Sequence, residues 1–406
     1  MRREKEEEWE KPVFPEIDPM EYHISQQIGK GAFSRVYLAY TPDGGQVAIK
    51  RLKLTSKPSS ILREINLLNK FIGKKNIVQL RDLIVDTATL QTTVITSYAD
   101  SDDFKSCLRL YTPRDIWKYM ESLITSLAEC EKQGIIHRDV KPGNFLFSRK
   151  TGKGLLIDFG LAQTLTEARD FQKTRMRTDT PGPSHAIGSM ETRRQRPNMA
   201  RSRPPDLPAE CPGVPDIESR ISLRAPLLPA QPRSGTHGYR APEILIPTRI
   251  QTTKIDVWCA GVILLCLLVG RGSIFRGRDT GDAYEIMAIR AFFGTDAFLH
   301  GVASLGADIF IAGTDVPNPS DMSMGKSVTA LKRACDRINP GLKGIMPDCA
   351  YDLCILALTF NPDDRPAATR LLDHEFLQMD PILLPDSRLD GELEIDISTQ
   401  IITQGE

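Results

Sequence analysis

The chain has 406 residues, 41% of them hydrophobic, so it can bury a sizeable core or form two lobes that share a cleft. Its 52 basic and 52 acidic residues cancel, which excludes the strong overall basicity of many nucleic-acid-binding proteins and predicts no membrane or direct nucleic-acid partner. The charged start, MRREKEEEWEKP, lacks the apolar segment of a signal peptide. Eight scattered cysteines without CxxC spacing indicate reduced thiols in an intracellular protein, not a zinc site.

A charged tail is expected over residues 1–19 and a small β-rich lobe over residues 20–97. Residues 21–54 alternate polar and apolar side chains with turn residues between them, which predicts an antiparallel meander with a hairpin at Pro42 to Gly45. Residues 60–71, SILREINLLNKF, have the spacing of apolar residues that is typical of a helix.

Two charged side chains of this lobe are candidates for a site. The stretch GKGAFSRV, residues 29–36, places two glycines between predicted strands; alone, this pattern fits either an ordinary strand turn or a hairpin that closes over phosphates. Lys50, in VAIK, needs an anionic partner if it faces a cleft, either a phosphate or a carboxylate. Glu64 can supply that carboxylate because it shares the helix face of Ile61 and Leu68.

Residues 98–378 are expected to form a larger, mostly helical lobe. From about residue 113 the apolar spacing is helical. The uncharged run Val257 to Gly270 fits a buried helix better than a membrane span, which needs about 20 residues.

The stretch GIIHRDVKPGNFLF, residues 134–147, places polar groups between apolar runs, where a packed core alone would not need them. Phosphoryl transfer needs such groups: Asp139 would orient the attacking hydroxyl, and Lys141 would neutralise the moving phosphoryl group. Asn144 and Asp158, the latter in LLIDFGLAQ, would hold Mg²⁺ through oxygen atoms. The HRDxKxxN pattern followed by DFG is far more specific than a lone HRD triplet.

Two segments are predicted to be flexible. Residues 164–234 are rich in proline and arginine and contain one aromatic residue, Phe171, which predicts a disordered insert in the large lobe. Its basic run fits a nuclear import signal, a nucleic-acid contact or a solvated disordered stretch, and comprises Arg193, Arg194, Arg196, Arg201 and Arg203. A flexible tail is expected over residues 379–406.

Over roughly residues 20–378 the sequence resembles a eukaryotic protein kinase. The supporting motifs are GTHGYRAPE (235–243), IDVWCAGVILL (255–265) and NPDDRP (361–366). The resemblance implies an α+β bilobal fold, with one regulatory helix in a small β-rich N-lobe and a larger α-helical C-lobe, and implies ATP and Mg²⁺ as cofactors.

The same resemblance assigns individual residues. The catalytic set is Asp139, Lys141, Asn144, Lys50 and Glu64. The ATP-binding set is Ile28, Gly29, Gly31, Ser34, Val36, Ala48, Lys50, Thr96, Ser97, Ala99, Leu146 and Asp158, with Thr96 as the gatekeeper, and the metal ligands are Asn144 and Asp158. Glu243 would pair with Arg365, Asp256 would brace the catalytic loop, and Thr236 would bond to Asp139 and Lys141. The stretch around Thr236, together with Lys141, looks like serine/threonine kinases.

A narrower resemblance is to the cell division cycle seven kinases. It rests on GAFSRVYLA, SYADSDDF, HRDVKPGNFLF, DFGLAQ and RSGTHGYRAPEIL, and on the position of the insert. It implies a Dbf-type activating subunit, subunits of the MCM replicative helicase as substrates, a role in starting DNA replication, and a nuclear location. The later insertion, over about 294–345, looks short for this family, which bears on how much surface a regulatory subunit would find.

Substrate choice is expected to depend on Arg233 and Arg240, which match family positions that contact an acidic or phosphorylated residue after the target serine or threonine. Arg240 also fits a role in the fold or at a phosphothreonine. Two other functions compete: an acidophilic cell-cycle kinase without an obligate subunit, and a pseudokinase scaffold. The complete catalytic set speaks against the scaffold.

Overall fold

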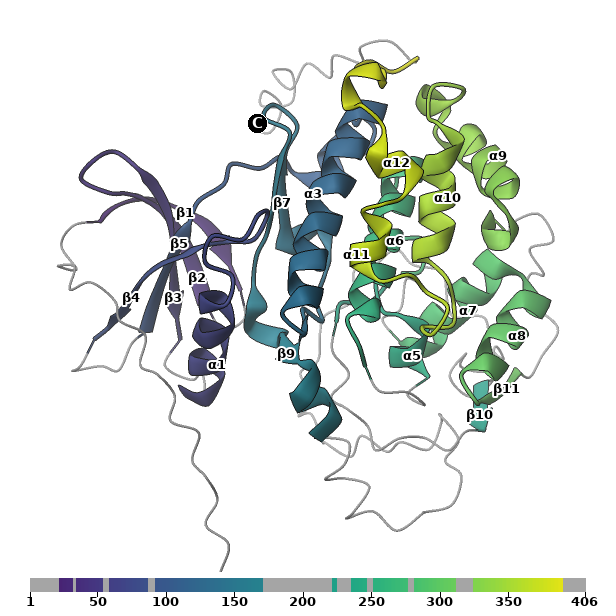
Figure 1. Ribbon diagram of the computed structural model, residues 1–406, viewed down its shortest axis with the longest axis horizontal. Coiled ribbons are helices and arrows are strands. Elements are labelled where there is room, and N and C mark those ends of the chain that lie inside the picture. The colour runs from purple at the N-terminus through teal and green to yellow at the C-terminus, as the bar shows by residue number, and fades with distance from the viewer. Residues whose placement is uncertain are drawn as a thin grey trace, which may run out of the picture.

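The computed structural model describes residues 22–31, 34–53, 58–86, 92–170, 221–224, 235–246, 251–276, 281–311 and 324–389. They form a small, mostly β lobe from the N-terminal part of the chain and a larger helical lobe from the rest, which stand side by side in Figure 1. The predicted α+β bilobal fold is therefore confirmed. All seven cysteines within the described residues are unpaired thiols.

The small lobe is built on a five-stranded antiparallel sheet in the order β1-β2-β3-β5-β4. Its strands are β1 (His23–Lys30), β2 (Ser34–Tyr40), β3 (Gln46–Leu52), β4 (Leu80–Val85) and β5 (Thr92–Ser97). The predicted hairpin joins β2 to β3, and Gly44 there takes a φ of 84°, which a residue with a side chain rarely adopts. Opposite Lys50 in the sheet lie Val36 on β2 and Val94 on β5.

One helix, α1 (Pro58–Asn69), belongs to this lobe, so the predicted helix over 60–71 is shifted by two residues at each end. Ile65, Leu67 and Leu68 of this helix are buried, and so is Glu64. The helix contacts the 3-10 turn η3 (Phe159–Leu161) of the large lobe, so its position is coupled to the segment that carries Asp158.

The large lobe is helical, as expected. Its longest helix, α3, begins with a capping box in which Thr112 and Asp115 bond each other's backbone N–H groups, and Pro113 occupies the first helical position. The helices are α2 (Phe104–Cys107), α3 (Pro113–Lys132), α5 (Pro242–Leu245), α6 (Lys254–Val269), α7 (Asp282–Phe293), α8 (Thr295–Ser304), α9 (Val328–Ile338), α10 (Asp348–Ala357), α11 (Ala368–Leu371) and α12 (Glu375–Gln378). Residues 165–170 are helical as well.

Helix α6 is the centre of this lobe, because every residue from Ile255 to Val269 is buried. A helix that is apolar on all sides needs such surroundings. Gly270 ends it in the left-handed conformation, with a φ of 66°. None of the described helices alone is long and apolar enough to cross a membrane; α7 and α8 pass such a test only as a pair, and their axes are bent by 118°.

Three short strand pairs hold the loops of the large lobe. They are β6 (Ile135–Ile136) with β9 (Gln163–Thr164), β7 (Phe145–Ser148) with β8 (Lys153–Leu156), and β10 (Ile221–Arg224) with β11 (Asp308–Ile311). The segment between β6 and β7 carries Asp139, Lys141 and Asn144, and Asp158 follows β8. Both segments thus leave strands that are anchored beside α3.

The structure differs from the sequence prediction at two boundaries. Residues 164–170, at the start of the expected insert, are strand and helix, and residues 221–224 form β10; the rest of 164–234 lies outside the described residues. The expected C-terminal tail begins too early, because residues 379–389 pack on the large lobe. Arg114 of α3 donates hydrogen bonds to the carbonyl oxygens of Pro381, Ile382 and Leu384. These residues are too far from Arg114 in the sequence for a local pattern to predict the contacts. The expected N-terminal tail, residues 1–19, lies outside the described part.

Candidate active site

The residues expected to bind ATP lie on the strands of the small lobe and at the start of the large lobe. Gly29 of β1 is paired with Val36 of β2, and Ala48 of β3 with Thr96 of β5. The side chains of Val36, Ala48 and Thr96, and that of Leu146 on β7, are only partly buried although most are apolar. Partly exposed apolar groups contributed by both lobes fit an adenine-sized ligand.

Backbone contacts refine this prediction at two points. Gly31 N–H donates to the Ser34 carbonyl oxygen at 2.9 Å, which closes the β1–β2 hairpin, while Ile28 stays exposed. Ser97 N–H donates to the Gln79 carbonyl oxygen at 2.8 Å, and its hydroxyl accepts from Gln79 N–H. Ser97 can therefore offer a ligand its carbonyl oxygen but not its N–H, and the donor must come from the backbone beyond it, where Ala99 lies.

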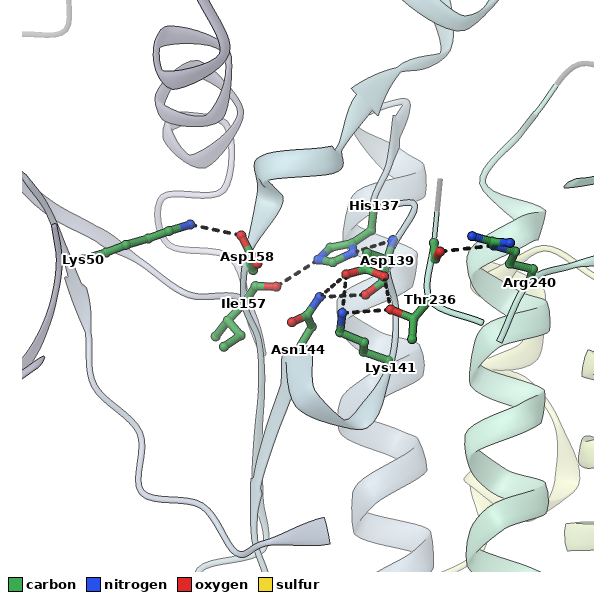
Figure 2. A network of polar contacts seen from close by, with 10 residues as sticks. Lys50, His137, Asp139, Lys141, Asn144, Ile157, Asp158, Thr236 and Arg240 are labelled. Carbon is green, nitrogen blue, oxygen red and sulfur yellow. Dashed lines mark hydrogen bonds and ion pairs between the residues drawn. The ribbon is translucent and has the colours of Figure 1, made fainter. Parts of the chain in front are cut away.

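Lys50 lies between two carboxylates, as Figure 2 shows in part. Its Nζ is 2.8 Å from Glu64 Oε1 on α1 and 3.0 Å from Asp158 Oδ1. Burial lowers the pKa of Lys50, but the two carboxylates outweigh burial and raise it above its usual value. Burial likewise raises the pKa of Asp158, and Lys50 more than offsets it, so the net direction is down. The site thus keeps Lys50 charged and Asp158 ionised at neutral pH.

Glu64→Gln tests the Lys50 ion pair. The amide removes the charge that holds the ammonium group, and we expect kcat/KM for ATP to fall by roughly tenfold to a hundredfold, because charge-assisted hydrogen bonds contribute about 1.5–3 kcal/mol. The measurement is steady-state phosphorylation at varied ATP concentration. Glu129→Gln is the matched control, because it removes the same group from a helix surface where Glu129 pairs with Lys132. Equal losses in both variants would contradict the role of Glu64.

The catalytic segment forms one hydrogen-bonded cluster (Figure 2). Lys141 Nζ donates to Asp139 Oδ2 at 2.7 Å and to Thr236 Oγ1 at 2.8 Å, and Thr236 Oγ1 donates to Asp139 Oδ1 at 2.8 Å. Asn144 Nδ2 donates to both the carbonyl and the Oδ2 oxygen of Asp139 at 2.9 Å. Asp139 is thereby fixed in orientation, and the contacts that the sequence resemblance implied for Thr236 are present.

Buried groups behind the cluster hold the loop backbone. Asp256 of α6 accepts hydrogen bonds from the N–H groups of His137 at 2.7 Å and Arg138 at 2.9 Å. Complete burial raises the pKa of Asp256 to about 7, although both N–H groups pull it down. Arg138 takes a φ of 69°, a strained conformation for a residue with a side chain, and these bonds help to hold it. The ring of His137 bonds the Ile157 carbonyl oxygen at 3.0 Å and packs edge-on against Phe159.

The two predicted metal ligands fit a magnesium-type cation. Because Asn144 uses its amide nitrogen on Asp139, its carbonyl oxygen is turned away from that residue, as Figure 2 shows. Asp158 is an ionised carboxylate with 47% of its side chain exposed. A neutral and a charged oxygen are the ligand types that such cations prefer alongside phosphate oxygens.

The substrate side is described only in part. Arg233 lies outside the described residues. Arg240 is present, but its side chain is 10% exposed and is bound by the protein itself: Nε donates to the Gly235 carbonyl oxygen at 3.1 Å, and Nη1 donates to Asp282 Oδ1 at 2.8 Å. The ion pair between Glu243 and Arg365, which the resemblance of the sequence to protein kinases implied, is present and completely buried.

Sequence reasoning missed three residues around Arg240. Asp282 and Glu285 belong to the first turn of α7, and His237 lies 2.7 Å from Glu285 Oε1. Asp282 and Arg240 are far apart in sequence, so no local pattern pairs them. A weak signal exists for Glu285, which lies four residues before the buried Ile289 and thus on an apolar face, the same feature that marked Glu64.

Comparison with known proteins agrees with this geometry. Residues 22–181 and 221–377 match the family model described as the protein kinase domain, and the chain therefore belongs to the protein kinase family. A protein kinase domain uses ATP together with a divalent metal, and the sites described above supply groups for both.

The similar curated proteins narrow this assignment. "Probable cell division control protein 7 homolog 2" of Encephalitozoon cuniculi is 29% identical, over 90% of this chain and 92% of that protein. The cell cycle protein kinase spo4 of Schizosaccharomyces pombe is 28% identical, over 90% of this chain and 86% of that protein. The cell cycle serine/threonine-protein kinase hsk1 of the same yeast is 28% identical, over 88% and 73%. The enzyme is a serine/threonine protein kinase, and the resemblance to cell division cycle seven kinases is confirmed.

Proposed function

We propose that this kinase transfers the γ-phosphoryl group of Mg²⁺-bound ATP to serine or threonine in acidic contexts, on subunits of the MCM replicative helicase in the nucleus, and so takes part in starting DNA replication. The observation that carries the proposal is the complete catalytic set in contact geometry, in a chain similar over most of its length to cell division control protein 7 homologs. A Dbf-type subunit is the proposed activator.

Catalysis, and not scaffolding alone, follows from how the polar groups are used. Lys50, Glu64 and Asp158 form a continuous charged chain, and Asp139 is oriented by three donors. Buried or partly buried charges cost free energy unless they are paired, and a binding module gains nothing from keeping this arrangement. When it is bound, the metal ion would draw negative charge from the phosphates; Asn144 and Asp158 would hold it.

In the reaction that this geometry supports, the substrate hydroxyl would hydrogen-bond to Asp139, which orients it toward the γ-phosphate and accepts its proton as the new bond forms. Lys141 lies beside Asp139 and would stabilise charge on the transferred group. Thr236 is hydrogen-bonded to both residues, so the loop that carries Thr236 and Arg240 is positioned together with the catalytic groups.

The experiment is a kinase assay with the full chain, purified alone and with the proteins that it retains from nuclear extract. The substrate is a purified hexameric replicative helicase. We expect Mg²⁺-dependent phosphorylation of serines followed by acidic residues, strongly stimulated by the retained subunit. Full activity of the isolated chain would favour the alternative of an acidophilic kinase without an obligate subunit. ATP binding without turnover under every condition would contradict the assignment as an active enzyme.

A further inference from the structure

The charge of Arg240 is already paired with a carboxylate of the protein. Its Nη1 lies 2.8 Å from Asp282 Oδ1, and the two side chains are only 10% and 13% exposed. Its Nε is committed to the Gly235 carbonyl oxygen. Among the described residues, no hydrogen bond uses Nη2, so one side of the guanidinium group remains for a ligand. A substrate anion would thus meet a cation that is oriented and already paired.

The charge balance around this loop is also unusual for an anion-binding site. Beside the Arg240–Asp282 pair lies Glu285, whose side chain is 3% exposed and whose Oε1 accepts from Gly238 N–H at 2.8 Å. Burial raises the pKa of Glu285, against the opposing influence of Gly238 N–H, Arg240 and His237. His237 Nδ1 is 3.3 Å from Arg240 Nη1. Two carboxyl groups of α7 therefore face one guanidinium group, which leaves little positive charge for a substrate.

We infer that Asp282 is a specificity-determining residue: it competes with the acidic group of the substrate for Arg240 and so sets how strongly the kinase prefers an acidic residue after its target. This inference rests on the proposed acid-directed function. A substrate carboxylate that binds Arg240 would take the place of the Asp282 carboxylate. Only the difference in free energy between the Arg240–substrate pair and the Arg240–Asp282 pair would then favour binding. A phosphate group, with a charge of about −1.5 to −2, would displace Asp282 more effectively.

Asp282→Asn separates charge from geometry. Asparagine keeps the size of the side chain and an oxygen that can accept the Arg240 hydrogen bond, and the Gly235 contact stays in place, so the guanidinium group keeps its orientation but loses its anionic competitor. We expect the ratio of kcat/KM for a Ser-Asp peptide to kcat/KM for the matching Ser-Ala peptide to rise roughly tenfold, the lower part of the range for charge-assisted pairs. The change should appear in KM and not in kcat, because the contact of Asp282 seen in the described part of the chain is with Arg240 and not with a group of the catalytic cluster.

The control variant is Asp296→Asn, which removes a carboxylate from the exposed first turn of the neighbouring helix α8 and should leave the ratio unchanged. Arg240→Ala should abolish discrimination, and adding Asp282→Asn to Arg240→Ala should restore none of it. All enzymes are full-length and carry their activating subunit. Because the ratio compares two peptides on one enzyme, a partial loss of folded protein does not change it.

The outcomes separate the two claims. If Arg240→Ala keeps the wild-type ratio, Arg240 does not contact the acidic residue, and the proposed reading of acidic substrates through it is wrong together with the role of Asp282. If Arg240→Ala loses the discrimination but Asp282→Asn leaves the ratio unchanged or lowers it, the competitor role of Asp282 is overturned while the acid-directed function stands. A larger gain for Ser-Asp than for Ser-phosphoserine peptides in Asp282→Asn supports the inference, since the weaker anion gains most from losing its competitor.

Discussion

Replacing Asp139 by asparagine should lower kcat by roughly a hundredfold to ten-thousandfold, the usual contribution of a positioned acid or base to catalysis. The carboxylate is the group to which Lys141, Asn144 and Thr236 all donate. An amide at this position keeps its shape, but it offers one acceptor oxygen in place of two and cannot take the proton of the substrate hydroxyl. The measurement is single-turnover phosphorylation of a peptide substrate at saturating ATP.

ATP binding should survive the same substitution, because Lys50 and Asp158 do not contact Asp139 in the described network. Fluorescence titration with a nucleotide analogue checks this, and Asp296→Asn serves again as an acid-to-amide change at an exposed site. A variant that kept near wild-type turnover would show that the hydroxyl is oriented by another group. A variant that lost turnover and nucleotide binding together would place the effect in the fold of the loop.

The parts of this site that sequence alone predicts are those in which short spacing fixes geometry. Asp139, Lys141 and Asn144 come from one loop, so their clustering follows from the chain itself. The contact between Lys50 and Glu64 was predictable because a helix face placed a carboxylate among apolar residues beside a lysine-bearing strand.

The parts that sequence did not predict depend on how distant elements pack. An aspartate at the start of α7 is an ordinary helix-terminal acid in sequence, since acids there are favoured by the helix dipole. Only the folded lobe brings Asp282 against Arg240 and shows that the supposed substrate arginine is already paired. The same holds for residues 379–389, which belong to the segment expected to be a flexible tail but whose backbone carbonyl groups are bound by Arg114.

Replacing Arg365 by methionine should lower the free energy of unfolding by about 3–5 kcal/mol, the usual cost of removing one partner of a buried ion pair. Arg365 is fully buried and binds both oxygens of Glu243, at 2.8 and 3.0 Å. It also donates to the carbonyl oxygens of Thr359, Lys254 and Phe360. The variant would leave a buried carboxylate and three carbonyl groups without their donor. Urea unfolding followed by tryptophan fluorescence measures the loss.

The double variant Arg365→Met with Glu243→Gln separates the two contributions. If the uncompensated charge of Glu243 causes most of the loss, removing that charge should recover part of the stability, so the double variant should be more stable than Arg365→Met alone. The three carbonyl groups lack their donor in the single and in the double variant. The loss of stability that remains in the double variant therefore measures the contribution of these carbonyl groups. Lys332→Met is the control: it breaks the exposed ion pair with Asp348 and should cost at most about 1 kcal/mol. A double variant no more stable than Arg365→Met would mean that Arg365 stabilises the lobe mainly by binding backbone carbonyl groups, so that the start of α6 and the segment that follows α10 depend on the guanidinium group and not on the carboxylate.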